Sequence, residues 1–433
     1  MKKLLFVTSA LLAIWSGGQA SAQEVSTKAP FQVTLDGWGA AYAGILPAQE
    51  AAPNTKSYAI KDDIHLLIDA HSRADNGLFY GVFVRTESVT RGDGAVNTER
   101  ANIYFQGDWG RIEAGDNEPP AYQMLHDTII ANDYAQVAGD SPGLNNGNSL
   151  TGPFQAQFVG GAPDAGVTNG SLQQTGLSLG ITNLGYYGDL PIWTSNAAKV
   201  NYKTPAVEGI QIGVSYAPDG RNHGGATVNT NDSANAVAAG QLTLPANGRS
   251  TPSLANYTDI VESAVTYKNS FEIGMAEPLG VLGGIAVTYG RALGSGGGGV
   301  GLTNISSLYL GIRGSYGGLK LGLGYTNDFH SREYRGGPYQ SDQDGFAFGG
   351  DYQIGPWVIG GYYQNARNHP DTYIIGSNTL VDEEVDLTYL LAPGLQLISS
   401  AYNFDYHDDG ALLGPLVVHR DGQIYLLGSA VTF

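Results

Sequence analysis

The sequence predicts an all-β fold, a transmembrane antiparallel up-and-down β-barrel of 16 strands with a long constricting loop folded into the lumen. Many segments alternate apolar and polar residues with a period of two, which is typical of a strand with one apolar face. The chain also ends on such a strand, and its last residue is the aromatic Phe433. In a bilayer, the last strand of a barrel must pair with the first, because an open edge leaves backbone groups without hydrogen bonds.

The composition agrees with a barrel that has a polar interior. There are 62 glycines and 26 tyrosines, hydrophobic residues make up only 42%, and cysteine is absent. Apolar side chains are required only on the outer face of such a barrel. Without a disulfide scaffold, stability is expected from hydrogen-bonded closure of the sheet. A secreted soluble β-protein could share this composition. The strand pattern therefore has to distinguish a membrane barrel from such a protein.

The first 22 residues are predicted to be an export signal. Lys2 and Lys3 precede an apolar stretch, Leu4 to Trp15, and Ala20-Ser21-Ala22 forms a small-residue cleavage site. The apolar stretch is too short to cross a bilayer as a helix. The domain prediction is therefore a signal peptide at 1–22 and one barrel domain at 23–433; an uncleaved anchor is the alternative.

The strands can be placed from the alternation, which is clearest between residues 307 and 329. Leu308, Leu310 and Ile312 share one face, Arg313 lies on the other, and Gly317-Gly318 forms a turn before the next alternating run. The predicted strands lie near 31–46, 57–71, 77–89, 97–107, 111–116, 196–203, 209–217, 257–270, 281–292, 305–316, 319–329, 343–353, 357–367, 379–391, 395–407 and 420–433. Residues 272–280 are interpreted as an enlarged turn. A water-soluble sandwich shows similar alternation, but it does not explain why long polar loops and short turns alternate.

The net charge of −18 restricts the partners of the protein. A nucleic-acid-binding protein would carry a basic patch, so no nucleic acid is expected. In a channel, acidic groups along the lumen would favour cations. The alternative is that most of the acidic residues lie on outer loops and do not affect the permeating ions.

Several segments resemble the Gram-negative general porins, in particular the alphaproteobacterial type. They are Phe31 to Gly37, Gly107 to Gly115, Asn196 to Pro205 and the terminal Phe433. The resemblance implies a homotrimer in the outer membrane, surrounded by lipid and lipopolysaccharide, that passes small hydrophilic solutes passively. It also implies a third outer loop that folds into the barrel and narrows it.

A long insertion at 117–195 occupies the place of that loop. Tyr122, Met124 and Leu125 are more apolar than a solvated loop requires, so this segment is expected to fold against the inner wall. The predicted acidic side of the constriction consists of Asp116, Glu118, Asp127, Asp133 and Asp140.

Strand phase predicts which charges line the opposing wall. These residues are Lys61, His65, Arg85, Arg100, Arg111 and Lys199. The resemblance implies that basic wall residues face the acidic loop and create a transverse field across the pore. For each single charge, ordinary lining of the lumen is the alternative.

The last strand has a second predicted role. Tyr425, Leu427, Val431 and Phe433 share one face, which is expected to close the barrel. The same residues resemble the terminal signal that the outer-membrane assembly machinery reads.

No catalytic or metal-ligating pattern is recognised, so neither an enzyme nor a cofactor is predicted. Acidic clusters at Asp382 to Glu384 and at Asp405, Asp408 and Asp409 could bind Ca²⁺, but a solvated rim is preferred. The leading hypothesis is a passive diffusion channel with a modest cation preference. The alternatives are a channel selective for sugars or dicarboxylates, and a plugged structural or adhesive barrel.

Overall fold

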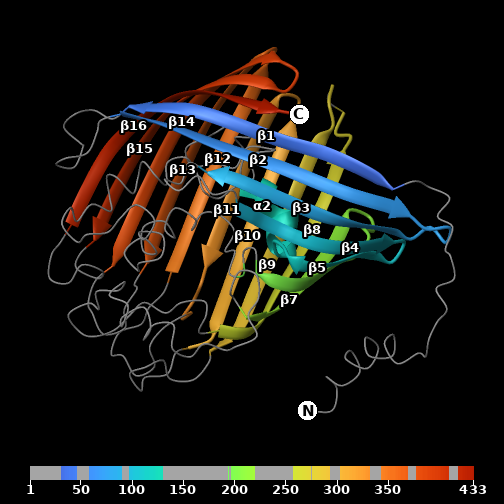
Figure 1. The fold of residues 1–433 in the computed structure, drawn as a ribbon. Helices are drawn as coiled ribbons and strands as arrows, with labels where there is room; N and C mark the ends of the chain where they lie inside the picture. Colours follow the sequence, from blue (N-terminus) through green and yellow to red (C-terminus); the bar gives the residue numbers. More distant parts are fainter. Residues whose placement is uncertain are drawn as a thin grey trace.

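The strands of the computed structural model close into one barrel (Figure 1). The structure describes residues 31–45, 58–89, 97–129, 194, 197–219, 257–274, 276–292, 303–331, 343–368, 377–408 and 418–433. Within these ranges, 16 antiparallel strands each pair with their neighbours in the sequence, and β1 pairs with β16. The predicted fold class, strand number and strand order are confirmed.

The strand bounds lie within two residues of those predicted. The strands are β1 (Gln32–Ile45), β2 (Tyr58–Arg73), β3 (Phe79–Val89), β4 (Asn97–Gly107), β5 (Gly110–Asp116), β6 (Ala198–Lys203), β7 (Ile210–Asp219), β8 (Tyr257–Phe271), β9 (Leu279–Ala292), β10 (Ile305–Tyr316), β11 (Leu319–Asn327), β12 (Gln343–Ile354), β13 (Trp357–Asn368), β14 (Asn378–Ala392), β15 (Leu395–Asp408) and β16 (Val418–Thr432). One helix, α2 (Pro120–Ile129), follows β5. Among the described residues, no helix is both long and apolar enough to cross a bilayer.

The apolar faces of the strands point outward. Leu321 is 56% exposed, whereas Tyr309, on the opposite face of the neighbouring strand, is 0% exposed. A water-soluble sandwich would bury the leucine face between its two sheets. The sandwich alternative is therefore wrong, and the exposed apolar band is the kind of surface that a bilayer covers.

The closing seam is continuous to the last residue. The register of β1 on β16 runs from Trp38 opposite Thr432 to Ile45 opposite Tyr425. Beyond it, Gly37 and Phe433 exchange two backbone hydrogen bonds of 3.0 Å each. A Cβ atom on Gly37 would lie 2.7 Å from both the His65 carbonyl oxygen and the Phe433 ring, so glycine allows this close packing at the seam.

Short connections join the strands at one end of the barrel. Gly317, in the turn between β10 and β11, has a φ of 56°, and Gly394, between β14 and β15, has a φ of 75°. Glycine adopts these left-handed conformations at little cost. The enlarged turn between β8 and β9 is confirmed, since the strands end at Phe271 and begin at Leu279. Because the strands are antiparallel, the connections that alternate with these turns leave from the other end.

Candidate functional site

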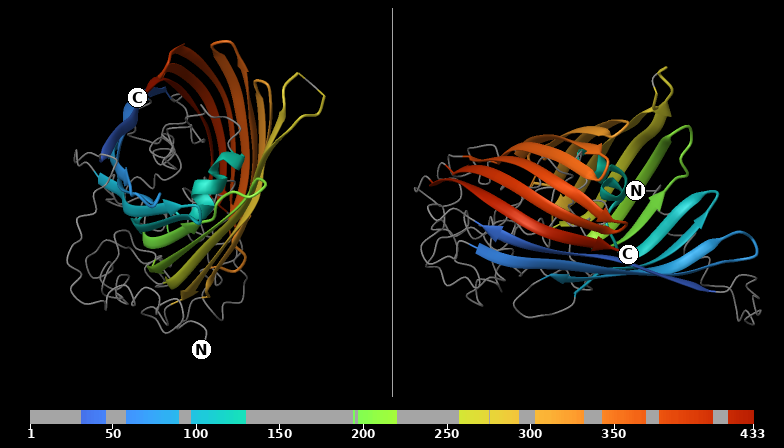
Figure 2. Two further views of the ribbon diagram at one scale, coloured as in Figure 1. Left: turned by 90° about the vertical axis from the view of Figure 1, so that its right-hand side faces the viewer. Right: turned by 90° about the horizontal axis from the view of Figure 1, so that it is seen from above.

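Helix α2 lies inside the barrel and packs against the wall formed by β6 to β12 (Figure 2). Pro120 occupies the first helical position, where its fixed φ favours the helix and its missing N–H is not needed. Ala121, Tyr122 and Leu125 form one apolar face and are buried. The helix therefore narrows the lumen by covering one side of it.

The apolar face of α2 packs against small residues on the inner wall. Ala264 of β8, Ala286 of β9 and Ala347 of β12 form one cluster with Ala121, Tyr122 and Leu125 of the helix and with Tyr309 of β10. Larger side chains at these inward positions would fill the space that the helix occupies. The predicted folding of this segment against the inner wall is thus seen for its described part.

A buried carboxylate joins the start of this segment to the wall. Glu118 forms an ion pair with Arg100 of β4, and its Oε1 lies 3.4 Å from Nη2 of Arg85 of β3. Asn117 Oδ1 accepts a hydrogen bond from the Glu118 backbone N–H at 2.9 Å, and Lys199 Nζ donates to the Asn117 carbonyl oxygen. Residues from β3, β4 and β6 are therefore tied to the segment just before α2. We call Arg85, Arg100 and Glu118 the Glu118 cluster.

A second carboxylate on the wall lies beside this cluster. Glu113 Oε1 is 2.6 Å from Arg111 Nε and 3.5 Å from Lys203 Nζ. Its Oε2 accepts hydrogen bonds from the side-chain amides of Asn117 at 2.5 Å and Gln123 at 3.1 Å. Arg111 also lies over the ring of Tyr104, with its guanidinium carbon 3.9 Å from the ring centroid. This arrangement holds the first turn of α2 against β5 and β6.

A family model described as "Gram-negative porin" matches residues 8–406. The chain belongs to the Gram-negative porin family. It is therefore an outer-membrane porin, and family and fold indicate a channel rather than an enzyme. No curated protein sequence matches it.

Solved porin structures are similar to this porin in fold. An anion-selective porin from Comamonas acidovorans aligns with a TM-score of 0.55 and 16% identity, over 93% of this chain and 100% of that one. A mutant of the Rhodobacter blastica porin aligns with a TM-score of 0.51 and 11% identity, over 93% and 100% of the two chains. A loop-deletion mutant of OmpT, an outer membrane protein of Vibrio cholerae, has the same TM-score of 0.51 and 11% identity, over 93% and 99%.

The structure brings some of the predicted constriction residues of this porin together. Glu118, Arg85 and Arg100 meet directly in one buried cluster, so these charges do not face one another across open lumen. Arg111 lies on the neighbouring strand with Glu113, and Lys199 is buried on β6. Asp116 ends β5 in register with Ala101 and Ala198 and lies within electrostatic range of Lys199.

The other predicted residues lie elsewhere. His65 is buried on β2 and stacks on Trp38 of β1, with ring centroids 4.1 Å apart. Lys61 is in β2 opposite Tyr42, and Asp127 is in α2, but their side chains are outside the described part. Asp133 and Asp140 lie outside the described residues. Tyr425, Leu427, Val431 and Phe433 face outward along the closing seam.

The group around Glu113 is not predicted from the sequence, although Glu113 and Lys203 follow the inward phase of Arg111 and Lys199. The sequence also predicts a solvated rim that contains Glu384. That interpretation is wrong, because Glu384 is inside β14 and only 3% exposed. In the described residues, no group of three or more His, Asp or Glu side chains is arranged to hold a metal ion.

The close contact between α2 and β7 leads to a testable prediction. A Cβ atom on the inward Gly213 would meet Pro120 and lie 2.6 Å from Met124 Sδ. Gly213→Ala should therefore push the helix toward the free side of the lumen, at a cost of about 1–3 kcal/mol for overpacking. We expect a lower single-channel conductance in planar-bilayer recordings.

The matched control is Gly283→Ala on β9, where the new Cβ would meet atoms only at 3.4 Å or more. This variant should conduct like the wild type. Equal conductance of Gly213→Ala and the wild type would show that the position of α2 does not limit the current.

Proposed function

We propose that this porin passes small hydrophilic solutes and ions by passive diffusion, with a modest preference for cations. The observation that carries the selectivity is a group of inward carboxylates, Asp351, Glu384 and Asp386, on β12 and β14. Together with the net charge of −18, these groups would attract cations into the lumen. Helix α2 supports the proposal further, because it narrows the passage by packing against the wall from β6 to β12.

The reversal potential in a KCl gradient across a planar bilayer tests the selectivity. We expect the sign of a cation-preferring channel, and we expect the preference to weaken at high salt, where charges in water are screened. The Comamonas acidovorans porin, in contrast, is described as anion-selective. An anion-selective sign for the present protein would show that its acidic residues lie outside the conduction path.

Two other functions remain as alternatives. A channel selective for sugars or dicarboxylates is favoured by the narrowing that α2 produces, and such a channel should be blocked competitively by its solute. A linear conductance without block by any tested solute would argue against it. A plugged structural barrel would conduct no current, and liposomes containing it would not swell in small sugars.

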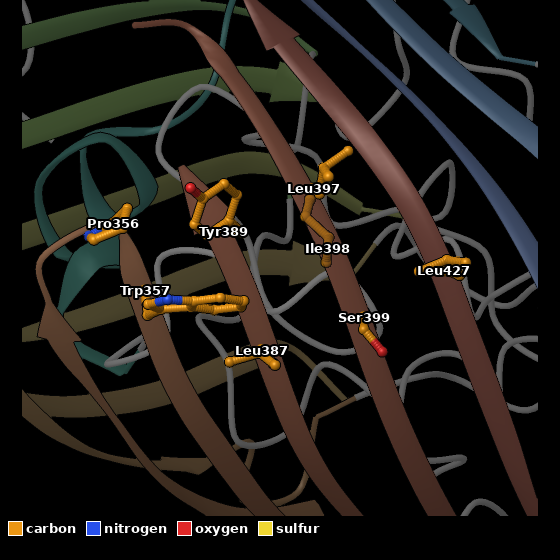
Figure 3. A pocket seen from close by; sticks show the side chains of 8 residues that line it. All are labelled: Pro356, Trp357, Leu387, Tyr389, Leu397, Ile398, Ser399 and Leu427. Carbon is orange, nitrogen blue, oxygen red and sulfur yellow. The ribbon is translucent and has the colours of Figure 1, made fainter. Parts of the chain in front are cut away.

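The apolar outer face of the barrel indicates that lipid surrounds it. A depression of about 460 Å³ on this face is lined by side chains that include Trp357, Leu387 and Leu427 (Figure 3). Lipid hydrocarbon chains would cover this apolar surface. We further propose contact with lipopolysaccharide, and a homotrimer that should appear as triplet closures in bilayer recordings.

We also propose that residues 1–22 are removed during export. Mass spectrometry of the purified protein should then give a chain that begins at Gln23. Retention of Lys2 and Lys3 in the membrane protein would indicate an uncleaved anchor instead. We also propose that the channel works without a cofactor and without calcium at its acidic clusters.

A further inference from the structure

Polar side chains on the inner wall form a row across β12 to β15. Asp351 of β12 is in register with Gly360 of β13, which is in register with Asp386 of β14. Asp386 is in turn opposite Ser400 of β15. Thr388, two residues beyond Asp386, shares its inward face. Gly360 has no side chain that would separate the two carboxylates.

The polar atoms in this row are buried without hydrogen bonds. Asp386 is 2% exposed, Thr388 0% and Ser400 4%. Among the described residues, both carboxylate oxygens of Asp386 and the hydroxyl oxygens of Thr388 and Ser400 have no hydrogen-bond partner. Proteins leave few buried polar groups unsatisfied, because each such group carries a desolvation penalty. Three adjacent side chains of this kind indicate a group that is bound from the lumen.

The charges around the row identify the sign of that group. Lys320 Nζ lies 4.0 Å from Asp351 Oδ2, so Asp351 has a cation beside it. Asp386 has no ion pair in the described part of the chain, and its electrostatic neighbour, Asp351, has the same sign. A cation is therefore the complementary ligand.

We propose that Asp386, Thr388 and Ser400 form a binding site for a monovalent cationic group that passes through the lumen. The carboxylate supplies the charge, and the two hydroxyl groups supply further oxygen ligands. The group is either an alkali ion or the ammonium group of an organic solute. The site rests on the proposed function, because it gives the channel a specific step in cation permeation.

The wall beside the row favours an ammonium ion with an apolar body. Tyr402 of β15 is opposite Glu384 of β14 on one side and Ile424 of β16 on the other. All three side chains are buried on the inner face. A solute whose ammonium group binds Asp386 would place its apolar part against Tyr402 and Ile424. A bare alkali ion would gain nothing from this surface.

The test compares Asp386→Asn with the wild-type porin in planar bilayers. The probes are KCl alone, over a wide concentration range, and phenethylammonium chloride added to KCl. We expect the wild-type conductance to saturate with KCl and phenethylammonium to block it. Since a hydrogen bond to a charged group is lost, Asp386→Asn should raise the half-blocking concentration at least about tenfold.

Two further variants control the result. Asp405→Asn removes a negative charge from an exposed position of β15 and should leave block and saturation unchanged. Thr388→Val keeps the charge and the volume but removes one hydroxyl group, so it should weaken the block by a smaller factor. This second variant tests the site even if Asp386→Asn does not assemble.

The outcomes separate the site from the channel function. Saturation that depends on Asp386, without block by phenethylammonium, assigns the site to alkali ions. A conducting wild type whose block and saturation are unchanged in both Asp386→Asn and Thr388→Val overturns the site and leaves the channel standing. A wild-type protein that forms no pore overturns the proposed function and this step with it.

Discussion

Replacement of Glu118 by Gln is expected to lower the cation preference of the channel about fourfold. A unit charge about 10 Å from a permeating ion in water acts on it with about 0.4 kcal/mol, which is about a factor of two in occupancy. Losing one negative charge lowers cation occupancy by that factor and raises anion occupancy by the same factor. The ratio of the two permeabilities should therefore fall about fourfold, and the reversal potential in a KCl gradient measures it.

The same substitution should also loosen the segment before α2. Glu118 is buried between Arg85 and Arg100, and removing one partner of a buried ion pair costs about 3–5 kcal/mol, because the other charge stays buried. In Glu118→Gln, two guanidinium groups would lose this partner. We expect noisier open-channel currents as the anchored segment moves.

The control for this prediction is Glu277→Gln, which removes an exposed carboxylate from the turn between β8 and β9. It should change neither selectivity nor noise. A double variant that also carries Arg100→Met should recover part of the stability and selectivity that Glu118→Gln loses. The effects of two residues in contact do not add, because removing the second partner also removes the unpaired buried charge. An unchanged reversal potential in Glu118→Gln would show that the Glu118 cluster does not act on permeating ions.

The barrel could be predicted from the sequence because the alternation of side chains between the two faces of a strand is a local pattern. A period of two assigns each residue of β10 and β11 to one face, and Gly317-Gly318 fixes the turn between them. The same rule gave the inward phase of Arg85, Arg100 and Lys199. Pairing of the first and last strands followed from the requirement that no edge be left open in lipid.

The contacts inside the lumen could not be predicted in the same way. Strand phase shows that Glu113 and Lys203 point inward, but not that Asn117 and Gln123 reach them from the next segment. Glu384 lies within the predicted strand at 379–391, but the alternation does not show which inward positions are covered and which face water. These contacts depend on how α2 packs against the inner wall, which no local pattern contains.

The strand order places the acidic and basic walls on opposite sides of the barrel. Lys199 and Lys203 are on β6 and Asp386 is on β14, eight strands apart in a closed barrel of 16. Charges of opposite sign on facing walls create a field across the pore. Because Glu113 and Glu118 neutralise part of the basic wall, the field in this porin depends on the β14 side as well as on the charges around α2.

Deletion of Phe433 is expected to reduce the amount of assembled porin about tenfold and to leave the conductance of the assembled fraction unchanged. The deletion removes both hydrogen bonds between Phe433 and Gly37, which contribute about 1 kcal/mol each. It also removes the ring that covers Gly37 at the seam. Together these losses exceed about 1.4 kcal/mol, which corresponds to a factor of ten.

Two substitutions separate the effect of the aromatic ring from that of the backbone hydrogen bonds. Phe433→Ala keeps the backbone hydrogen bonds but lacks the ring, and Phe433→Tyr keeps both. If the ring is the signal for assembly, Phe433→Ala should resemble the deletion, and Phe433→Tyr should assemble like the wild type. The yield of heat-modifiable barrel in outer-membrane fractions measures assembly, and bilayer recording measures conductance. The conductance of the assembled fraction should not change, because α2 packs against β6 to β12 and the seam joins β1 to β16. A normal yield of the deletion variant would contradict the closing role of Phe433.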